Sequence, residues 1–332
     1  MKATIKRLVE TASPPGYEST IRDVIKDEIK PLKGEVDALG NLIVRIGAKT
    51  KDGLRVMLAA HMDEIGVMIS HIDENGFARF SPLGGVRPNT CFGGRVLFIN
   101  GAHGVINGEV IESTDKVIPF DKLFIDTGAK SRKDSPVKVG DVGVFERSFL
   151  DLGDRLVSKS MDDRIGCAVL IEAMRQIKKT PHELVCVFST QEEVGLRGAT
   201  GAAYSIDPDL GISLDVTAWG DTPKSIKMAV ALGKGPAIKV RDGGMIADPR
   251  VVDLMVESAR KAGIPYQMEI LEMGTTDARM MQVTRAGVPA GCISIPCRYV
   301  HSPSEMVDYT DVQNAVKLLV AILSKPIHLP ES

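Results

Sequence analysis

The chain has 332 residues, of which 44% are hydrophobic and 25% are charged, and its formal net charge is −2. This composition is typical of a globular protein that is long enough to bury a large core. The near-neutral charge excludes a strongly basic protein of the nucleic-acid-binding or membrane-surface class, and no run of about 18 apolar residues predicts a membrane span. Residues 1–10 lack the apolar core of a signal peptide, so we expect a cytoplasmic location without nucleic-acid or membrane partners.

The five cysteines favour a reducing compartment. Their number is odd, no two of them form a Cys-x-x-Cys pair, and most have apolar neighbours. Free cysteines in such surroundings behave as small hydrophobic residues. We therefore expect reduced, mostly buried thiols at Cys91, Cys167, Cys186, Cys292 and Cys297.

Residues 1–65 have the pattern of an α/β segment. Apolar residues recur at helical spacing between residues 18 and 30, and Pro31 would end that helix. The apolar run 54–60 has the length and composition of a buried strand.

Residues 66–155 have a different character, with frequent glycine and no predicted helix. Short β-rich runs separated by turn signals occupy residues 66–71, 94–99, 105–111 and 123–126. A turn enters a further strand at 138–145. Short strands at such close spacing predict a small β-barrel or sandwich.

Residues 156–325 return to alternating strands and helices. The predicted helices are 163–178, 251–262 and 312–323, and the predicted strands are 184–190, 210–216 and 292–295. Such alternation predicts a mostly parallel sheet that is covered by helices on both faces. The expected fold class is therefore α/β, with one discontinuous domain formed by residues 1–65 and 156–332 and a small β domain inserted at 66–155.

Two of the six histidines and several carboxylates follow predicted strands. His61 comes directly after the strand 54–60, and His301 follows the strand 292–295 closely. In open α/β sheets, functional sites form beyond the carboxyl ends of the strands. Acidic residues occupy comparable positions at Asp63, Asp162, Asp163, Glu192, Glu193 and Asp215.

Each of these residues has an ordinary structural interpretation when it is taken alone. A histidine at a strand end is commonly hydrogen-bonded, a Glu-Glu pair is commonly solvated, and Asp162 could cap the following helix. A buried carboxylate is unfavourable unless it is paired or binds metal, so the coincidence of these acids with two histidines favours a metal site. Imidazole nitrogen and carboxylate oxygen suit zinc, with cobalt or manganese as alternatives.

The number of candidate ligands fits two metal ions. Ions about 3.5–4 Å apart need one bridging carboxylate and further ligands for each ion. The sequence supplies one bridge, two histidines and two acids, and one glutamate then remains as a base. Adjacent residues of a strand point to opposite faces, so Glu192 and Glu193 could act together only if the chain turns after the strand.

Five short blocks carry these residues, and they occur in the order His-Met-Asp-Glu at 61–64, Met-Asp-Asp-Arg-Ile-Gly at 161–166, Gln-Glu-Glu-Val-Gly-Leu-Arg-Gly-Ala at 191–199, Ser-Leu-Asp-Val-Thr at 213–217 and Arg-Tyr-Val-His-Ser at 298–302. Together they resemble the signature of the TET-type aminopeptidases, which form family forty-two of the metallopeptidases. The resemblance covers essentially the whole chain. Some members of that family carry the label endoglucanase.

The resemblance implies a role for each matching residue. Asp162 would bridge two metal ions, with Asp163 as the alternative. The other ligands would be His61 and Asp215 for one ion and Glu193 and His301 for the second. Glu192 would be the general base and acid, and Asp63 would orient the His61 imidazole.

The resemblance also implies an activity and an assembly. The expected function is a metal-dependent aminopeptidase that removes N-terminal residues from short peptides with a free N-terminus. The insert would be PDZ-like and would help subunits associate into homo-oligomers, from a dimer to a tetrahedral dodecamer. Residues 271–275 depart from the glycine-rich pattern of the family near the expected substrate side-chain pocket. The histidines without an assigned role are His71, His103, His182 and His328.

Three other functions are compatible with parts of this pattern. A related dinuclear deacylase or carboxypeptidase would have the same metal site with different substrate anchoring. A glycoside hydrolase would use two carboxylates about 5–9.5 Å apart and would not need histidines at strand ends, and the single tryptophan offers little stacking surface for sugars. A non-catalytic assembly protein would keep a vestigial site.

Overall fold

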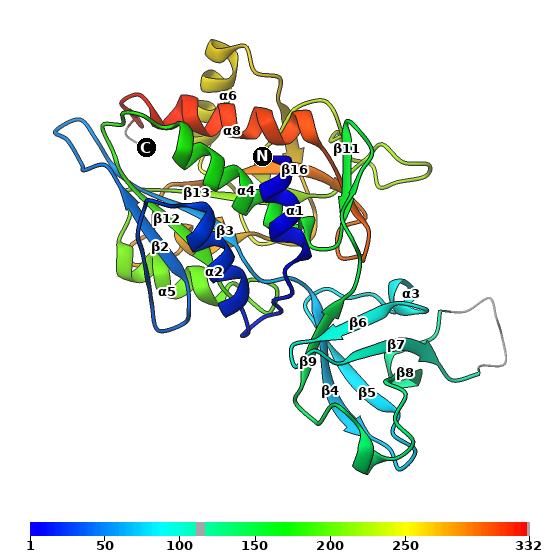
Figure 1. The fold of residues 1–332 in the computed structure, drawn as a ribbon. Helices are drawn as coiled ribbons and strands as arrows, with labels where there is room; N and C mark the ends of the chain where they lie inside the picture. The colour runs from blue at the N-terminus through cyan, green and yellow to red at the C-terminus, as the bar shows by residue number, and fades with distance from the viewer. Residues whose placement is uncertain (111–116, 331–332) are drawn as a thin grey trace.

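The computed structural model describes residues 1–110 and 117–330. In this part of the chain, a large mixed sheet and a separate small barrel lie side by side (Figure 1). The last residue of the predicted strand 105–111 lies outside the described residues. No described helix is long and apolar enough to cross a membrane.

The large sheet has a parallel centre, and most of its outer strands pair in an antiparallel way. Its strands are β1 (Gly34–Val36), β2 (Leu42–Ile46), β3 (Arg55–His61), β10 (Leu150–Asp151), β11 (Arg155–Ser158), β12 (Glu183–Ser189), β13 (Leu210–Thr217), β14 (Ala237–Arg241), β15 (Gln267–Ile270), β16 (Ala290–Arg298) and β17 (Glu305–Asp308). The order is β1-β2-β12-β3-β13-β16-β17-β11-β10, with β14 and β15 joined beside β16. The neighbours β12, β3, β13 and β16 pair in parallel, which confirms the expected mostly parallel core.

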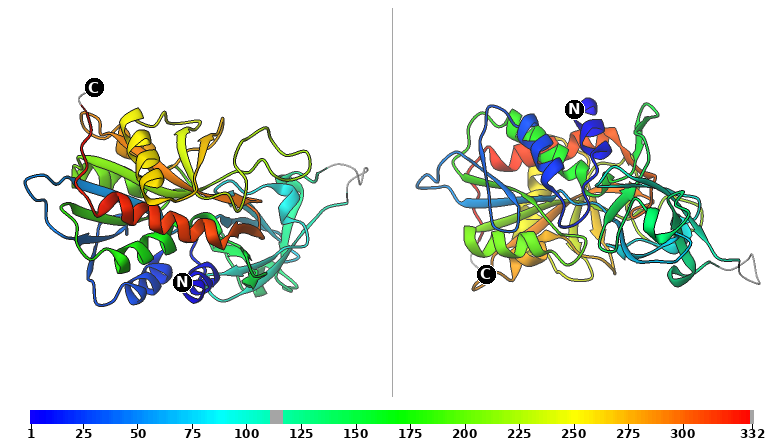
Figure 2. Two further views of the ribbon diagram at one scale, coloured as in Figure 1. Left: turned by 90° about the horizontal axis from the view of Figure 1, so that it is seen from above. Right: turned by 60° about the horizontal axis from the view of Figure 1, so that its bottom comes forward.

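Helices cover both faces of this sheet (Figure 2). They are α1 (Lys2–Glu10), α2 (Ser19–Glu28), α4 (Met161–Gln176), α5 (Arg197–Ile206), α6 (Pro249–Ala262), α7 (Asp277–Gln282) and α8 (Tyr309–Leu323). On β3, Leu58 packs in one core with α4 and α8, whereas its neighbour Met57 packs in a second core with α5 and α7. Successive strand residues thus serve opposite faces, and the doubly covered sheet is confirmed.

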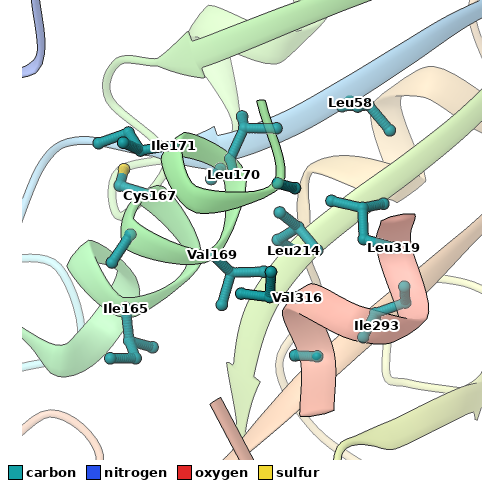
Figure 3. Packing of buried hydrophobic residues seen from close by; sticks show 14 of the residues in the cluster. Leu58, Ile165, Cys167, Val169, Leu170, Ile171, Leu214, Ile293, Val316 and Leu319 are labelled. Atoms are coloured by element: carbon teal, nitrogen blue, oxygen red, sulfur yellow. The ribbon is translucent and has the colours of Figure 1, made fainter. Parts of the chain in front are cut away.

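The core beneath α4 and α8 places the central strands. Val169 of α4 lies next to Leu214 of β13 and Val316 of α8, and Leu319 of α8 packs on the other side of Leu214 (Figure 3). Ile165 of α4 belongs to the same core. All these side chains are buried. Helix packing on this face therefore holds α4, whose first residues include the acidic pair, over the ends of the central strands.

The inserted segment forms a closed antiparallel barrel with its own hydrophobic core. Its strands are β4 (Gly66–Ile72), β5 (Ala78–Leu83), β6 (Arg95–Phe98), β7 (His103–Gly108), β8 (Leu123–Asp126) and β9 (Val142–Phe145), in the order β4-β5-β8-β7-β6-β9. Short helical turns also occur: α3 (Pro88–Cys91), η1 (Phe120–Lys122) and η2 (Arg132–Asp134). They are too short to show a helical period in sequence, which explains why no helix was predicted here. The exact division at residues 65 and 155 stays a prediction.

Several elements begin or end where capping residues allow it. The helix predicted at 251–262 starts at Pro249, because Asp248 accepts the N–H of Arg250 and proline suits the first helical position. Gly263 ends it with φ of 64°. The helix predicted at 163–178 starts at Met161, but its next two residues do not have helical backbone angles. All five cysteines are free and buried, as expected.

Candidate active site

The predicted site residues gather at the carboxyl ends of the parallel strands. His61 is the last residue of β3, and Asp215 lies near the end of β13. Glu192 and Glu193 follow β12, and His301 follows β16. Because these four strands run in parallel, their ends meet at one edge of the sheet.

The chain turns after β12, and this turn separates the roles of the two glutamates. Gln191 has a positive φ of 53°, so the strand does not continue through Glu192 and Glu193. The N–H of Glu192 donates to Oδ1 of Asp63 at 3.0 Å, and the N–H of Glu193 donates to Oδ2 at 3.1 Å. Asp63 thus holds this turn, and both Glu192 and Glu193 line the cavity that also contacts His61 and Asp162. Oδ1 of Asp63 also lies 3.4 Å from Nδ1 of His61.

Two groups of potential metal ligands share one carboxylate. The first contains His61, Asp162 and Asp215, the second contains Asp162, Glu193 and His301, and the ligand atoms within each group lie within 4.8 Å of one another. Oδ1 of Asp162 is 3.0 Å from Nε2 of His61, and its Oδ2 is 3.3 Å from Nε2 of His301. One oxygen of Asp162 thus faces each group.

Asp163 occupies a different position from its neighbour. Its Oδ2 accepts the N–H of His61 at 3.2 Å, and its Oδ1 accepts the N–H of Gly166 at 3.1 Å. The carboxylate of Asp163 therefore supports the main chain of β3 and of α4. Of the two alternatives for the shared ligand, this geometry favours Asp162.

The carboxylates and imidazoles of the site are buried close together, an arrangement that bound metal cations would stabilise. Burial raises the pKa of Glu192, of Glu193 and of Asp215, and nearby carboxylates add to the effect. Burial lowers the pKa of His301, but Glu193 and Asp162 outweigh it and raise that pKa to about 12. Oε1 of Glu193 is buried and has no hydrogen-bond partner among the described residues. An orphaned carboxylate oxygen amid imidazole and carboxylate donors fits a site for divalent metal cations.

Glu305 belongs to this site, and sequence reasoning missed it. The residue is buried on β17, where its Oε2 accepts the N–H of Asp162 at 2.9 Å and its Oε1 accepts the N–H of His301 at 2.8 Å. One carboxylate thus holds the main chain of two potential ligands. An acid within a predicted strand would have been the only signal, and no strand was predicted there.

A buried ion cluster beneath the site was also missed. Nζ of Lys159 lies 2.6 Å from Oε2 of Glu64, and Nη2 of Arg164 lies 3.4 Å from Oε1 of the same carboxylate. Burial lowers the pKa of Lys159, although Glu64 opposes this effect. Arg164 also donates to the carbonyl of Leu8 at 2.7 Å. The cluster ties α1, the end of β3 and the start of α4 together.

A cavity of about 640 Å³ opens onto the candidate ligands. Its wall includes His61, Asp162 and Glu192. Four residues of the stretch 271–275 also line it, namely Leu271, Met273, Gly274 and Thr275. The segment that departs from the expected glycine-rich pattern therefore lies where a substrate side chain could contact it.

The model of the M42 glutamyl aminopeptidase family matches residues 40–318. A putative aminopeptidase of Acetivibrio thermocellus is 48% identical over 95% of this chain and 96% of its own length. The lysyl aminopeptidase of Pyrococcus furiosus is 38% identical over 97% of this chain and 96% of its own. The chain belongs to the M42 aminopeptidase family. Membership of this family confirms the expectation that the protein is a peptidase.

Solved structures of similar proteins agree with M42 membership. Aminopeptidase APDkam598 from Desulfurococcus kamchatkensis superimposes with a TM-score of 0.93 at 40% identity, over 97% of this chain and 94% of that one. The TET1 peptidase of Pyrococcus horikoshii has a TM-score of 0.88 at 33% identity, over 97% of this chain and 98% of that one. That peptidase can assemble into a tetrahedron or a large octahedral shell. The predicted TET-type relationship of this M42 chain is confirmed.

Proposed function

We propose that this aminopeptidase removes N-terminal residues from short peptides with the help of two divalent metal ions. The observation that supports this most directly is the single carboxylate of Asp162 between two groups of ligands. His61 and Asp215 would hold one ion, and Glu193 and His301 would hold the other. Zinc is the first candidate, with cobalt and manganese as alternatives for the same donors. Bound ions of this kind acidify a water and polarise a carbonyl.

Glu192 is proposed as the general base and acid. Its Oε2 lies 3.9 Å from Nε2 of His61, and its side chain lines the cavity without belonging to either ligand group. From this place its carboxylate can accept the proton of the attacking water and then donate it to the departing amine. Asp63 fixes the Glu192 backbone and the His61 ring together, and thereby positions base and ligand relative to each other.

An exopeptidase must also recognise the free α-amine of its substrate. The cavity wall carries the carboxylates of Asp162, Glu192, Glu193 and Asp215. Three of these carboxylates are proposed metal ligands, so the bound ions would offset much of their negative charge, and a related deacylase or carboxypeptidase would share them. The match to the M42 family and to relatives named aminopeptidases therefore carries the choice of an aminopeptidase over these alternatives.

We further propose that the protein acts as a cytoplasmic homo-oligomer. The similar TET1 peptidase can assemble into a tetrahedron or a large octahedral shell, and the buried free thiols of this chain suit a reducing compartment. The barrel would help the subunits associate, in a dimer or in a dodecamer. Light scattering coupled to size-exclusion chromatography distinguishes these states, and a monomer at working concentration would refute the proposal.

The central test is a panel of aminoacyl chromogenic substrates with a free amine, including leucyl, glutamyl and lysyl forms. Activity is measured on the purified protein, after chelation, and after addition of zinc, cobalt or manganese. Loss on chelation and recovery with metal is the expected result, and the panel then identifies the preferred side chain. Hydrolysis of N-acylated but not free-amine substrates would instead indicate a deacylase.

A further inference from the structure

The loop after β5 leaves the barrel and lies against the candidate metal site. An ideal Cβ built on Gly85 would lie 2.2 Å from Nδ1 and 2.5 Å from Cε1 of His301. An ideal Cβ on Gly84 would lie 2.8 Å from Oε2 of Glu193. The loop backbone therefore packs against two members of the same ligand group.

This contact fixes one edge of the His301 imidazole. Nε2 of the ring faces Oε2 of Glu193 at 3.1 Å and Oδ2 of Asp162 at 3.3 Å. The opposite Nδ1 edge lies against Gly85. Gly85 is not among the glycines with positive φ, so it is required there for space and not for backbone conformation. A side chain at this position would have to displace a ring that has little freedom to move.

Arg87 extends the same wall toward the substrate. It lines the cavity together with Gly85, and its side chain is exposed. Within residues 1–110 and 117–330, its guanidinium has no hydrogen bond or ion pair. A guanidinium binds a carboxylate through two parallel hydrogen bonds. A peptide whose N-terminal residue lies at the candidate metal site would carry its C-terminal carboxylate away from that site, where a cation on the wall can meet it.

We propose that residues 84–87, in the loop after β5, form one wall of the active site. In this wall, Gly85 fixes the position of the His301 imidazole and Arg87 binds a carboxylate of the substrate. This inference rests on the proposed peptidase function. It makes the barrel a part of the site itself, in addition to any role in association. The carboxylate comes either from the C-terminus of a short peptide or from an acidic side chain, and the experiment below distinguishes the two.

The positioning of His301 by Gly85 is tested with Gly85→Ala. The metal affinity of the apo-protein is measured by titration with zinc against a competing chelator, below the melting transition of each variant. We expect one of the two ions to bind about ten- to hundred-fold more weakly, as is typical when a group behind a metal ligand is disturbed. Gly201→Ala on α5 is the control, because its new Cβ would meet only Leu39 Cδ1 at 3.2 Å. An unchanged zinc affinity in Gly85→Ala overturns the positioning role of Gly85. A wild-type protein that binds no zinc overturns the proposed function instead.

The carboxylate contact is tested with Arg87→Ala on three peptides: Leu-Gly-Gly, its C-terminal amide, and Glu-Gly-Gly amide. The KM of the wild type and the variant is compared for each peptide. Loss of a hydrogen-bonded guanidinium–carboxylate pair should weaken the binding of the peptide about ten-fold, and KM should rise by the same factor. A rise of this size for Leu-Gly-Gly, with loss of its advantage over the amide, identifies the C-terminal carboxylate. A rise confined to Glu-Gly-Gly amide identifies the side chain.

Arg132→Ala is the matched control for this second test. Arg132 lies in η2 of the same barrel, is exposed, and does not line the cavity. The Arg132 variant should keep the wild-type order of the three KM values. Equal KM values for wild type and Arg87→Ala on all three peptides overturn the carboxylate contact. A wild-type enzyme that is inactive on all three peptides would count against the proposed function and not against this residue.

Discussion

Replacing Glu305 with glutamine removes one of the two main-chain contacts that its carboxylate makes. The two oxygens accept the N–H groups of Asp162 at 2.9 Å and of His301 at 2.8 Å. Glutamine offers one acceptor oxygen, and its amide nitrogen would place a donor against a donor. Leaving a buried N–H donor without its acceptor costs about 1–3 kcal/mol, so the free energy of unfolding should fall by about that amount.

The same substitution should weaken metal binding. Asp162 and His301 belong to one ligand group, so a shift of either backbone moves a ligand atom. We expect about a ten- to hundred-fold loss of affinity for one ion, measured by chelator competition, together with the stability loss measured by chemical denaturation.

Asp311→Asn provides the matched control. Asp311 is a buried carboxylate that accepts the N–H groups of Gly233 and Gly235, both at 2.7 Å, and it does not line the cavity. This variant should lose comparable stability and keep its metal affinity. The reasoning is refuted if Glu305→Gln binds both ions as tightly as the wild type, or if Asp311→Asn loses metal to the same extent.

Three further predictions concern the base, a ligand and the pH dependence of stability. Glu192→Gln should lower kcat by about 10²–10⁴-fold. Its metal content, measured by elemental mass spectrometry, should stay at the wild-type level, and full activity would remove Glu192 from the mechanism. His301→Ala should lose part of that metal content, and a variant that retained both ions would show that His301 is not a ligand. Burial lowers the pKa of His182, whose Nδ1 accepts the N–H of Leu54 at 3.0 Å and whose Nε2 donates to the carbonyl of Lys325 at 2.8 Å. Because the folded state binds this proton less readily than the unfolded state, stability should be retained above the unfolded pKa, near 6.5, and be lost as the pH falls below it. Denaturation curves of the wild type and His182→Asn between pH 7.5 and 5 check this, and an identical pH dependence in both would contradict it.

The sequence by itself determined the class of fold and the set of candidate ligands. Apolar runs with the lengths of buried strands, such as 54–60 and 210–216, alternate with helical periods, and this pattern depends on local hydrophobic spacing alone. His61 and Asp215 could be selected because they lie at strand ends, where a buried charged group is unfavourable without a partner. The change to short, glycine-punctuated strands at 66–155 likewise predicted the barrel.

The tertiary structure alone decided how these residues are held. Glu305 lies 143 residues along the chain from Asp162, and Asp63 lies 129 residues from Glu192, yet each pair is joined by a hydrogen bond. The geometry that favours Asp162 over Asp163 as the proposed shared ligand depends on the backbone angles at the start of α4, which no hydrophobic period encodes. The approach of Gly85 to His301 depends on the place of the barrel beside the sheet. Contacts between such distant segments leave no local pattern in the sequence, because they form only when the strands that carry them have been brought to one edge of the sheet.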